Sequence, residues 1–216
     1  MKIVNLSLQN TILNTFVAEL RDVDIQKDSM RFRRNIERIG EIMAYEISKE
    51  LDYKETAVTT PNGVAMERLS TDNVVLGTIL RAGLPLHRGF HNYYDRAENA
   101  FVSAYRKYSD DTNFDIQIEY LASPSLEGKT LLLVDPMLAT GLSAFLSYKA
   151  LCSKGTPGKF VLATVIASEQ AVEYVKQHFP DDAIVYCAAI DPVLNSHSYI
   201  VPGLGDAGDL CFGEKE

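Results

Sequence analysis

The stretch TLLLVDPMLATGLSA, residues 130–144, decides the fold class of this chain. Four consecutive apolar residues, Leu131–Val134, follow a Glu-Gly-Lys turn signal and predict a central strand of a parallel sheet, covered on both faces. Asp135 comes at the carboxyl end of this strand, which is the edge where open α/β sheets bind ligands. Because the first turn of the following helix offers unpaired backbone N–H groups, the loop between strand and helix is predicted to bind a phosphate.

Strands and helices alternate along most of the chain. Apolar residues at intervals of three and four predict helices between Thr11 and Tyr53, and short apolar segments on either side of Pro61-Asn62-Gly63 predict a hairpin. The segment 114–122 alternates apolar and polar residues, as a half-exposed antiparallel strand does. The other predicted strands are 74–80, 100–105, 160–167 and 184–189, and the other predicted helices are 85–96, 141–152 and 169–179.

This order of elements predicts an α/β fold with an open parallel sheet and helices on both faces. A single domain spans 1–216, because no change of composition marks a boundary. It has a helical amino-terminal region at 1–55 and a projecting hairpin at 105–121, whose polar tip suits a flexible lid. The carboxyl-terminal segment, 190–216, is so rich in Gly and Asp that no packed element is expected there.

The chain is acidic, with a formal charge of -8 from 29 acidic and 21 basic residues. This charge argues against a general surface for nucleic acid or anionic membranes, since phosphates select clustered Lys and Arg. One basic cluster, Arg-Phe-Arg-Arg at 31–34, is diluted by Glu37 and Glu41. A solvated helix face, a subunit or allosteric contact and a nucleic-acid contact remain open for that cluster.

The amino-terminal residues lack a secretory leader pattern, and no stretch approaches 18 consecutive apolar residues. Three cysteines at wide spacings, Cys152, Cys187 and Cys211, fit reduced thiols better than disulfides or a zinc site. The expected location is therefore the cytoplasm. His87 and His91 have the spacing of ligands on one helix face, but no zinc-protease Glu accompanies them, so surface positions are expected for both.

Three residues of the loop after the central strand have the chemistry that a phosphate monoester needs. Thr140 and Ser143 supply hydroxyl groups, and Gly141 allows the backbone to approach the ligand closely. The loop is not the phosphate loop of nucleoside triphosphatases, because the Gly-Lys-Thr of 128–130 precedes the strand. A capped helix start would explain Thr140 alone, but not the acid, Asp135, at the strand end.

The segment Leu131–Ala144 resembles the phosphoribosyl-pyrophosphate (PRPP) loop of the type I phosphoribosyltransferase family, and its Asp-Pro-Met-Leu-Ala-Thr-Gly form resembles that of the uracil-specific members. Further matches come in the expected order, so that the resemblance spans nearly the whole chain. They are RDVDIQKDSMRFR (21–33), ILRAGLPL (79–86), YR (105–106) and YIVPGLGDAGD (199–209). By this resemblance the carboxyl-terminal segment is a hood over the base.

The resemblance implies an enzyme of pyrimidine salvage that transfers the phosphoribosyl group of PRPP to uracil. It implies Mg²⁺ as the cofactor, bound mainly through PRPP and without a dedicated set of protein ligands. The residues that it implies for PRPP are Arg81, Arg106, Asp135, Pro136, Met137, Leu138, Ala139, Thr140, Gly141, Leu142, Ser143 and Asp206. Those that it implies for uracil are Ile200, Gly205, Asp206 and Ala207, and its catalytic residues are Asp135, Arg106 and Asp206.

Some features depart from the family or leave alternatives open. Leu142 occupies a place where the family usually has Gly, and its spacing from Phe145 and Leu146 predicts that it joins a buried stripe. A regulator that keeps the fold but binds RNA or another protein is one alternative, and a phosphoribosyltransferase for another base is a second. A homodimer or homotetramer, with the amino-terminal helices at the interface, is expected. The sequence leaves open a purine nucleotide effector and the order of substrate binding.

Overall fold

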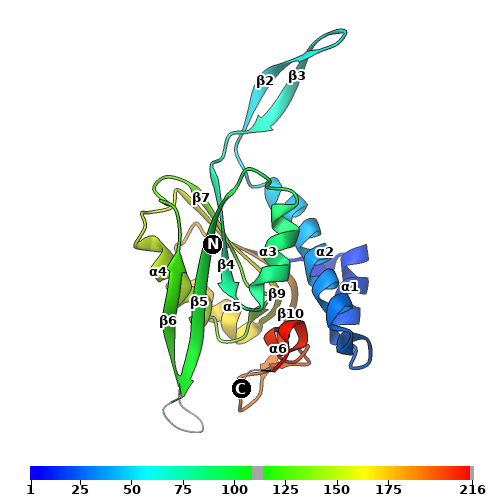
Figure 1. Cartoon of the computed structure of the whole chain (residues 1–216), viewed down its shortest axis with the longest axis vertical. Coiled ribbons are helices and arrows are strands. Elements are labelled where there is room, and N and C mark those ends of the chain that lie inside the picture. Colours follow the sequence, from blue (N-terminus) through cyan, green and yellow to red (C-terminus); the bar gives the residue numbers. More distant parts are fainter. Residues whose placement is uncertain (109–113, 215–216) are drawn as a thin grey trace.

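The computed structural model describes residues 1–108 and 114–214, and it describes side chains throughout these ranges except at 104–108 and 114–117. A sheet in the order β1-β10-β9-β7-β4-β5-β6, with β8 paired to β9, forms the centre (Figure 1). Its strands are β1 (Lys2–Asn5), β4 (Val74–Leu80), β5 (Glu98–Tyr108), β6 (Phe114–Ala122), β7 (Thr130–Val134), β8 (Met137–Leu138), β9 (Lys159–Ser168) and β10 (Ile184–Asp191).

The predicted open parallel sheet is confirmed. Every described pairing in it is parallel except that of β5 with β6, which is antiparallel as the alternating pattern of 114–122 predicts. All five residues of β7 are buried, and β7 pairs with β4 on one side and β9 on the other. An apolar run without alternation is what a strand with two covered faces requires.

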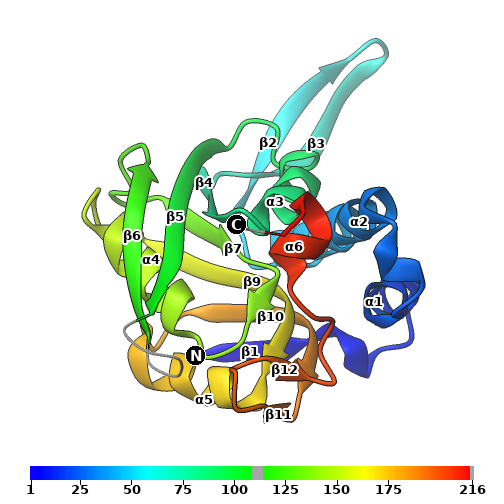
Figure 2. The same ribbon diagram turned by 60° about the horizontal axis from the view of Figure 1, so that its bottom comes forward.

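Helices cover both faces of the sheet, as Figure 2 shows. Leu132 and Val134 point into one core, together with buried residues of α1 (Ile12–Arg21), α2 (Ser29–Ser48) and α3 (Gly83–His91). Leu131 and Leu133 point into the opposite core, with residues of α4 (Leu142–Cys152) and α5 (Glu169–His178). The short 3₁₀ helices η1 (Leu6–Leu8) and η2 (Ile25–Lys27) flank α1 in the chain.

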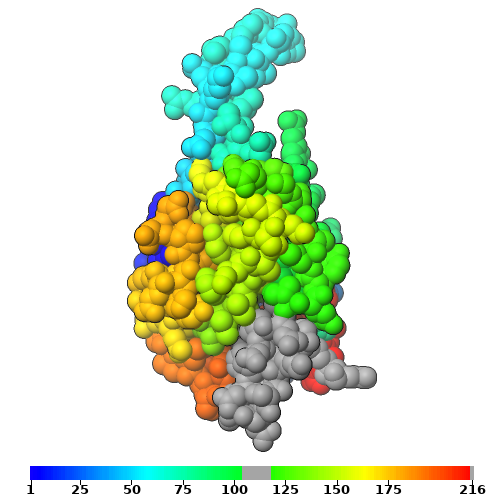
Figure 3. Space-filling view, turned by 90° about the vertical axis from the view of Figure 1, so that its left-hand side faces the viewer, coloured from blue at the N-terminus to red at the C-terminus, as the bar shows by residue number. Residues whose placement is uncertain are grey.

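A long hairpin, β2 (Tyr53–Thr60) and β3 (Gly63–Ser70), extends from one end of the molecule. The predicted Pro-Asn-Gly turn is confirmed, since Thr60 pairs with Gly63. All but one of its strand residues are exposed, and the space-filling view shows the hairpin clear of the body (Figure 3). A second hairpin is formed by β5 and β6, and its predicted tip, 109–113, lies outside the described residues.

Two sequence predictions about the chain ends are wrong. Residues 2–5 lie in the predicted helical region 1–55 but form β1, because their register on β10 extends the sheet. The Gly- and Asp-rich end does contain a packed element, α6 (Ala207–Phe212), whose Ala207 and Cys211 are buried against the core. The Asp206 carboxylate caps α6 by accepting a hydrogen bond from Asp209 N at 3.0 Å.

The helix predicted at 85–96 is displaced, since α3 begins at Gly83 and ends at His91. It ends early because Tyr94 turns inward, stacks on Phe90 and donates a hydrogen bond to Ala44 O at 2.9 Å. The prediction that Leu142, Phe145 and Leu146 form a buried stripe is also wrong. These three are half-buried, and the buried positions of α4 are Ala144, Ser147 and Leu151.

The prediction of surface positions for His87 and His91 also fails, since both side chains are half-buried. His87 is half-buried and not a surface residue, because its ring packs on Phe101 and its Nε2 lies 2.8 Å from the Asn99 amide oxygen. Cys152 is half-buried at the end of α4, whereas Cys187 and Cys211 are buried. All three cysteines are free thiols, as their spacings predict.

Candidate active site

The segment after β7 is held tightly before it reaches the helix. Asp135 N donates to Ala163 O at 3.1 Å, Ile166 N donates to Pro136 O at 3.0 Å, and Met137 and Leu138 form the short strand β8 on β9. Ser168 Oγ donates to Ala139 O at 2.6 Å. The loop backbone is therefore held against β9 as far as Ala139.

Asp135 is the buried acid of this region. Its relative exposure is 8%, and its Oδ1 accepts one long hydrogen bond, 3.4 Å from Met137 N. Burial disfavours the charged carboxylate and raises the pKa of Asp135 to about 7, although the Met137 amide acts in the opposite direction. A carboxylate with one weak partner is poised to accept hydrogen bonds from a ligand's hydroxyl groups.

Gly141 makes the turn from the loop into α4. Its φ is +82°, and a Cβ at this position would lie 2.8 Å from Cδ1 of Tyr174 on α5. Both features exclude a side chain. Thr140 Oγ1 accepts a hydrogen bond from Leu142 N at 3.4 Å, and Thr140 and Ser143 are partly exposed. The first-turn amides of α4 and these two residues thus lie at the amino-terminal end of the helix, and their binding of a phosphate stays a prediction.

Gly141→Ala is expected to raise the KM for a phosphate-bearing substrate about tenfold or more, because the added methyl must displace Tyr174 or shift the loop. Steady-state kinetics at varied substrate concentration would measure this. Gly128→Ala is the matched control: φ there is +67°, but no atom lies within 4 Å of the added Cβ. Equal effects of the two substitutions would contradict a role for the Gly141 turn in binding.

Arg81 follows β4, the neighbour of β7, so it lies at the same edge of the sheet as Asp135. Its Nη2 donates to Asp209 Oδ1 at 3.0 Å and to Gly213 O at 3.3 Å, which ties the carboxyl-terminal segment to this edge. Its Nε is buried and has no hydrogen-bond partner among the described residues. The Arg81 side chain as a whole is 37% exposed at this edge of the sheet.

The backbone of Arg106 lies in β5 opposite Ile116, and its side chain lies outside the described part of the structure. The position of the Arg106 guanidinium relative to Arg81 and Asp135 therefore stays a prediction. In the sheet, β5 pairs directly with β4, and Ser103 is the register partner of Leu80. Arg106 thus comes three residues beyond the end of β4 along β5.

The carboxyl-terminal segment contains the hairpin β11 (Val193–Leu194) and β12 (Ile200–Val201) and then α6 (Figure 2). Ile200 and Ala207 are buried in the core, while Gly205 and Asp206 are exposed. Gly205 has a φ of +91°. The inward side chains of Ile200 and Ala207 fix the backbone, so the polar groups that this segment can present are mainly N–H and C=O groups.

Three arginines attach this segment to the body, and none of these contacts was predicted from the sequence. Besides the Arg81 contact, Arg33 Nη1 donates to Cys211 O at 2.5 Å, and Arg21 pairs with Asp191.

In the basic cluster 31–34, Arg31 pairs with Glu19, and Arg34 pairs with Glu37 and Glu41, so the charge of the cluster is largely neutralised. The spacing Asp206-x-x-Asp209 is the signal that could have revealed α6, since Asp is a frequent helix cap.

Among the described residues, no group of three or more His, Cys, Asp or Glu side chains could hold a metal ion. The described helices also include none that is long and apolar enough to cross a membrane. The carboxylate oxygens of Asp135 and Asp206, which the resemblance implies for PRPP, suit Mg²⁺ by type but not in number. Any magnesium ion would need further oxygens from a bound substrate.

Comparison with known proteins places these features in a class. A family model described as "Uracil phosphoribosyltransferase" matches residues 7–214. The uracil phosphoribosyltransferase of Porphyromonas gingivalis is 59% identical over 215 residues, covering 100% of both chains. That of Methanothermobacter thermautotrophicus is 40% identical over 86% of this chain and 85% of its own.

Two solved structures resemble the fold. The AQ2163 protein of Aquifex aeolicus aligns with a TM-score of 0.87 at 26% identity, covering 98% of each chain. A hypoxanthine phosphoribosyltransferase of Staphylococcus aureus aligns with a TM-score of 0.51 at 16% identity, over 75% of this chain and 76% of its own, and shares the fold. The open sheet and its strand-end loop thus define a phosphoribosyltransferase. Within that class, the chain belongs to the uracil phosphoribosyltransferase family.

Proposed function

We propose that this chain transfers the 5-phosphoribosyl group of PRPP to N1 of uracil, giving uridine monophosphate and pyrophosphate. The observation that carries the proposal is the buried Asp135 carboxyl at the end of β7, directly before a backbone turn at Gly141 that accepts no side chain. A sugar phosphate needs both parts, a hydroxyl acceptor and a phosphate cradle.

The donor is held by the loop. The amides of Ala139–Ser143, with the Thr140 and Ser143 hydroxyls, surround the 5-phosphate at the amino terminus of α4. The same PRPP site is also lined by the remaining residues of the loop, Pro136, Met137, Leu138 and Leu142. Asp135 accepts hydrogen bonds from the ribose hydroxyls, and its negative charge stabilises the positive charge that develops on the ring as the bond to pyrophosphate breaks.

The leaving pyrophosphate is neutralised by Arg81 and Arg106. A guanidinium binds phosphate oxygens in a forked geometry, and the Arg81 side chain is partly exposed at this edge of the sheet. Magnesium, held mainly by PRPP oxygens, supplies further charge stabilisation when bound. Closure of the 105–121 hairpin over the site would exclude water, so that uracil and not water attacks the anomeric carbon.

Uracil is selected by backbone groups of the carboxyl-terminal segment, which we call the hood (190–216). The N–H and C=O groups of Ile200, Gly205 and Ala207 pair with the acceptor-donor-acceptor edge of uracil, and Asp206 faces the donor. Cytosine would present an amino group to a backbone donor and leave both unpaired, which costs about 1–3 kcal/mol for each buried group.

The direct test mixes the purified protein with Mg²⁺, PRPP and one base at a time, and follows nucleotide formation. Uracil should give uridine monophosphate, whereas cytosine and hypoxanthine should give little product. Nucleotide from hypoxanthine in place of uracil would indicate a transferase for another base. A protein that binds nucleotides but forms none would indicate a regulator.

We also propose a homodimer or homotetramer in the cytoplasm. The exposed β2–β3 hairpin supports self-association more directly than the amino-terminal helices, because Val64 and Met66 are exposed on one of its faces beside Ala57. Free thiols at all three cysteines suit a reducing compartment. Light scattering should give at least twice the monomer mass, 24.0 kDa, and a purine nucleotide effector can be tested in the same assay.

A further inference from the structure

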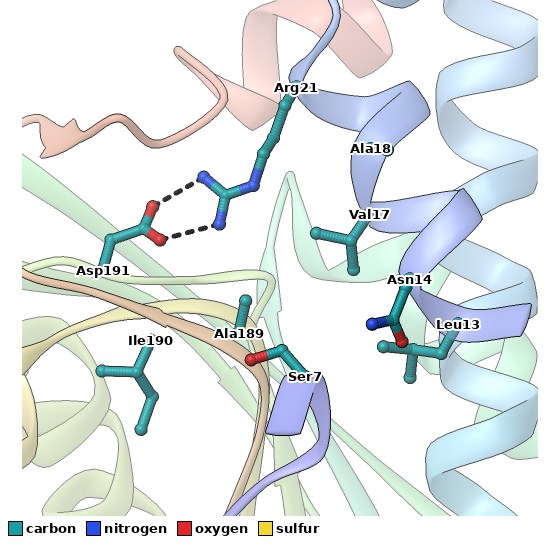
Figure 4. A pocket seen from close by; sticks show the side chains of 9 residues that line it. All are labelled: Ser7, Leu13, Asn14, Val17, Ala18, Arg21, Ala189, Ile190 and Asp191. Atoms are coloured by element: carbon teal, nitrogen blue, oxygen red, sulfur yellow. Dashed lines mark hydrogen bonds and ion pairs between the residues drawn. The ribbon is translucent and has the colours of Figure 1, made fainter. Parts of the chain in front are cut away.

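A forked ion pair joins the last residue of α1 to the last residue of β10. Arg21 Nη1 lies 2.7 Å from Asp191 Oδ2, and Arg21 Nη2 lies 2.7 Å from Asp191 Oδ1 (Figure 4). The Asp191 side chain is 6% exposed and that of Arg21 is 24% exposed. A bidentate pair with one buried partner has fixed geometry as well as charge.

The same two side chains hold the backbone of the hood at Gly203. Arg21 Nη1 donates to Gly203 O at 2.9 Å, and Gly203 N donates to Asp191 Oδ2 at 2.9 Å. Both polar backbone groups of one buried residue are thus satisfied by one ion pair. Without the pair they would be left unpaired in the interior, so the turn would have to move.

Gly203 forms the turn that sets the direction of the hood's backbone. Its φ is +59°, and a Cβ there would lie 2.1 Å from Ile200 O, so the turn folds closely on the preceding strand. Ile200 precedes this turn, and Gly205 and Ala207 follow it. A shift at Gly203 would therefore move the backbone groups on its two sides relative to each other.

We propose that Arg21 and Asp191 are positioning residues for base recognition: through Gly203 they set the spacing of the hood's backbone groups that pair with the pyrimidine. The inference rests on the proposed function of the hood. The pair is assigned no contact with PRPP, because the loop proposed for PRPP follows β7, whereas this pair lies at the end of β10, two strands away in the sheet.

A cavity of about 300 Å³ borders the pair on the side of α1. Its other lining residues come from η1, α1 and β10, namely Ser7, Leu13, Asn14, Val17, Ala18, Ala189 and Ile190 (Figure 4). Since this space adjoins the guanidinium, it could admit a small guanidinium ion after the Arg21 side chain is removed. A guanidinium ion added to the solution should therefore restore part of the function that Arg21→Ala loses.

The test measures separate KM values for uracil and PRPP in wild type, Arg21→Ala, Arg21→Lys and Asp191→Asn. Arg21→Ala and Asp191→Asn should raise the KM for uracil about tenfold or more, with kcat and the KM for PRPP changed less than about threefold. The KM of Arg21→Lys for uracil should lie between those of wild type and Arg21→Ala, because Lys keeps the positive charge but cannot form the bidentate pair. Millimolar ethylguanidinium should lower the raised KM of Arg21→Ala.

Arg31→Ala is the matched control, since Arg31 also pairs with a carboxylate across α1 and α2, that of Glu19 at 3.1 Å, and makes no hydrogen bond or ion pair with the described residues of the hood. Its KM for uracil should equal that of wild type. An unchanged KM for uracil in folded Arg21→Lys and Asp191→Asn, or an equal rise in the KM for PRPP, would overturn the inference alone. Wild-type protein that makes no uridine monophosphate would overturn it together with the proposed function.

Discussion

Asp135→Asn should lower kcat about 10²–10³-fold while it stabilises the folded protein above neutral pH. The loss of activity follows from charge: Asn can still accept hydrogen bonds from ribose hydroxyls, but it cannot stabilise a positive ring. The gain in stability follows from burial, because an ionised carboxylate with one long hydrogen bond is disfavoured where Asp135 lies.

The pH dependence of this gain can be derived from the pKa of Asp135. Its folded-state pKa, about 7, is above the ordinary value of 3.8, so the folded state holds a proton between these values that the unfolded state has released. The contribution of the protonated group to stability is complete below pH 3.8 and is lost as the pH rises through 7. At pH 8 the wild type should therefore be less stable than Asp135→Asn by up to about 4 kcal/mol, and at pH 4 by almost nothing.

Urea denaturation of both proteins at pH 4.5, 6 and 8, without substrate, would measure this difference. Asp95→Asn, at an exposed position, is the control and should show no such trend. In the wild type, kcat/KM for PRPP should also rise with pH through about 7 as Asp135 ionises, and the variant should lack this limb. A pH-independent difference in stability would mean that Asp135 is ionised in the empty site at every pH tested.

The parts of the fold that could be predicted are those with a local signal. The unbroken apolar run Leu131–Val134 predicts a strand covered on both faces, and the alternation at 114–122 predicts an edge strand with one exposed face. The acid and the glycine turn after β7 are also local, because their positions relative to the strand and to α4 follow from chain order. Sequence alone therefore indicates the type of ligand.

The attachment of the hood could not be predicted in this way. Arg21 and Asp191 are 170 residues apart, and neither stands in a pattern that selects the other among the 29 acids and 21 bases. The burial of Asp191 depends on the contacts at the end of β10 with β9, Arg21 and Gly203, which are set by the tertiary fold and not by the local sequence. Helix α6 was missed because Gly208 lowers helix propensity, whereas packing of Ala207 and Cys211 on the core stabilises it.

Arg81→Ala should lower kcat/KM for PRPP about 10²–10³-fold, because the leaving pyrophosphate loses a forked charge contact. Arg81→Lys should recover only part of this loss, since an ammonium offers a point charge in place of the fork. Arg88→Ala is the matched control: Arg88 lies on α3, its side chain is 76% exposed, and its contact with Glu37 is a surface pair at 3.3 Å. Similar losses in Arg81→Ala and Arg88→Ala would contradict a specific role for Arg81.

A substitution at Asp209 should have the opposite effect at this site, because it should strengthen the binding of pyrophosphate. The Asp209 carboxylate accepts the Arg81 Nη2 hydrogen bond at 3.0 Å, so a pyrophosphate group must compete with Asp209 for this guanidinium. Asp209→Asn weakens the competitor without removing the arginine, and it should lower the inhibition constant for pyrophosphate about three- to tenfold. Product-inhibition kinetics would measure this constant. Weaker pyrophosphate binding in Asp209→Asn would mean that Asp209 orients Arg81 for the ligand and does not compete with it.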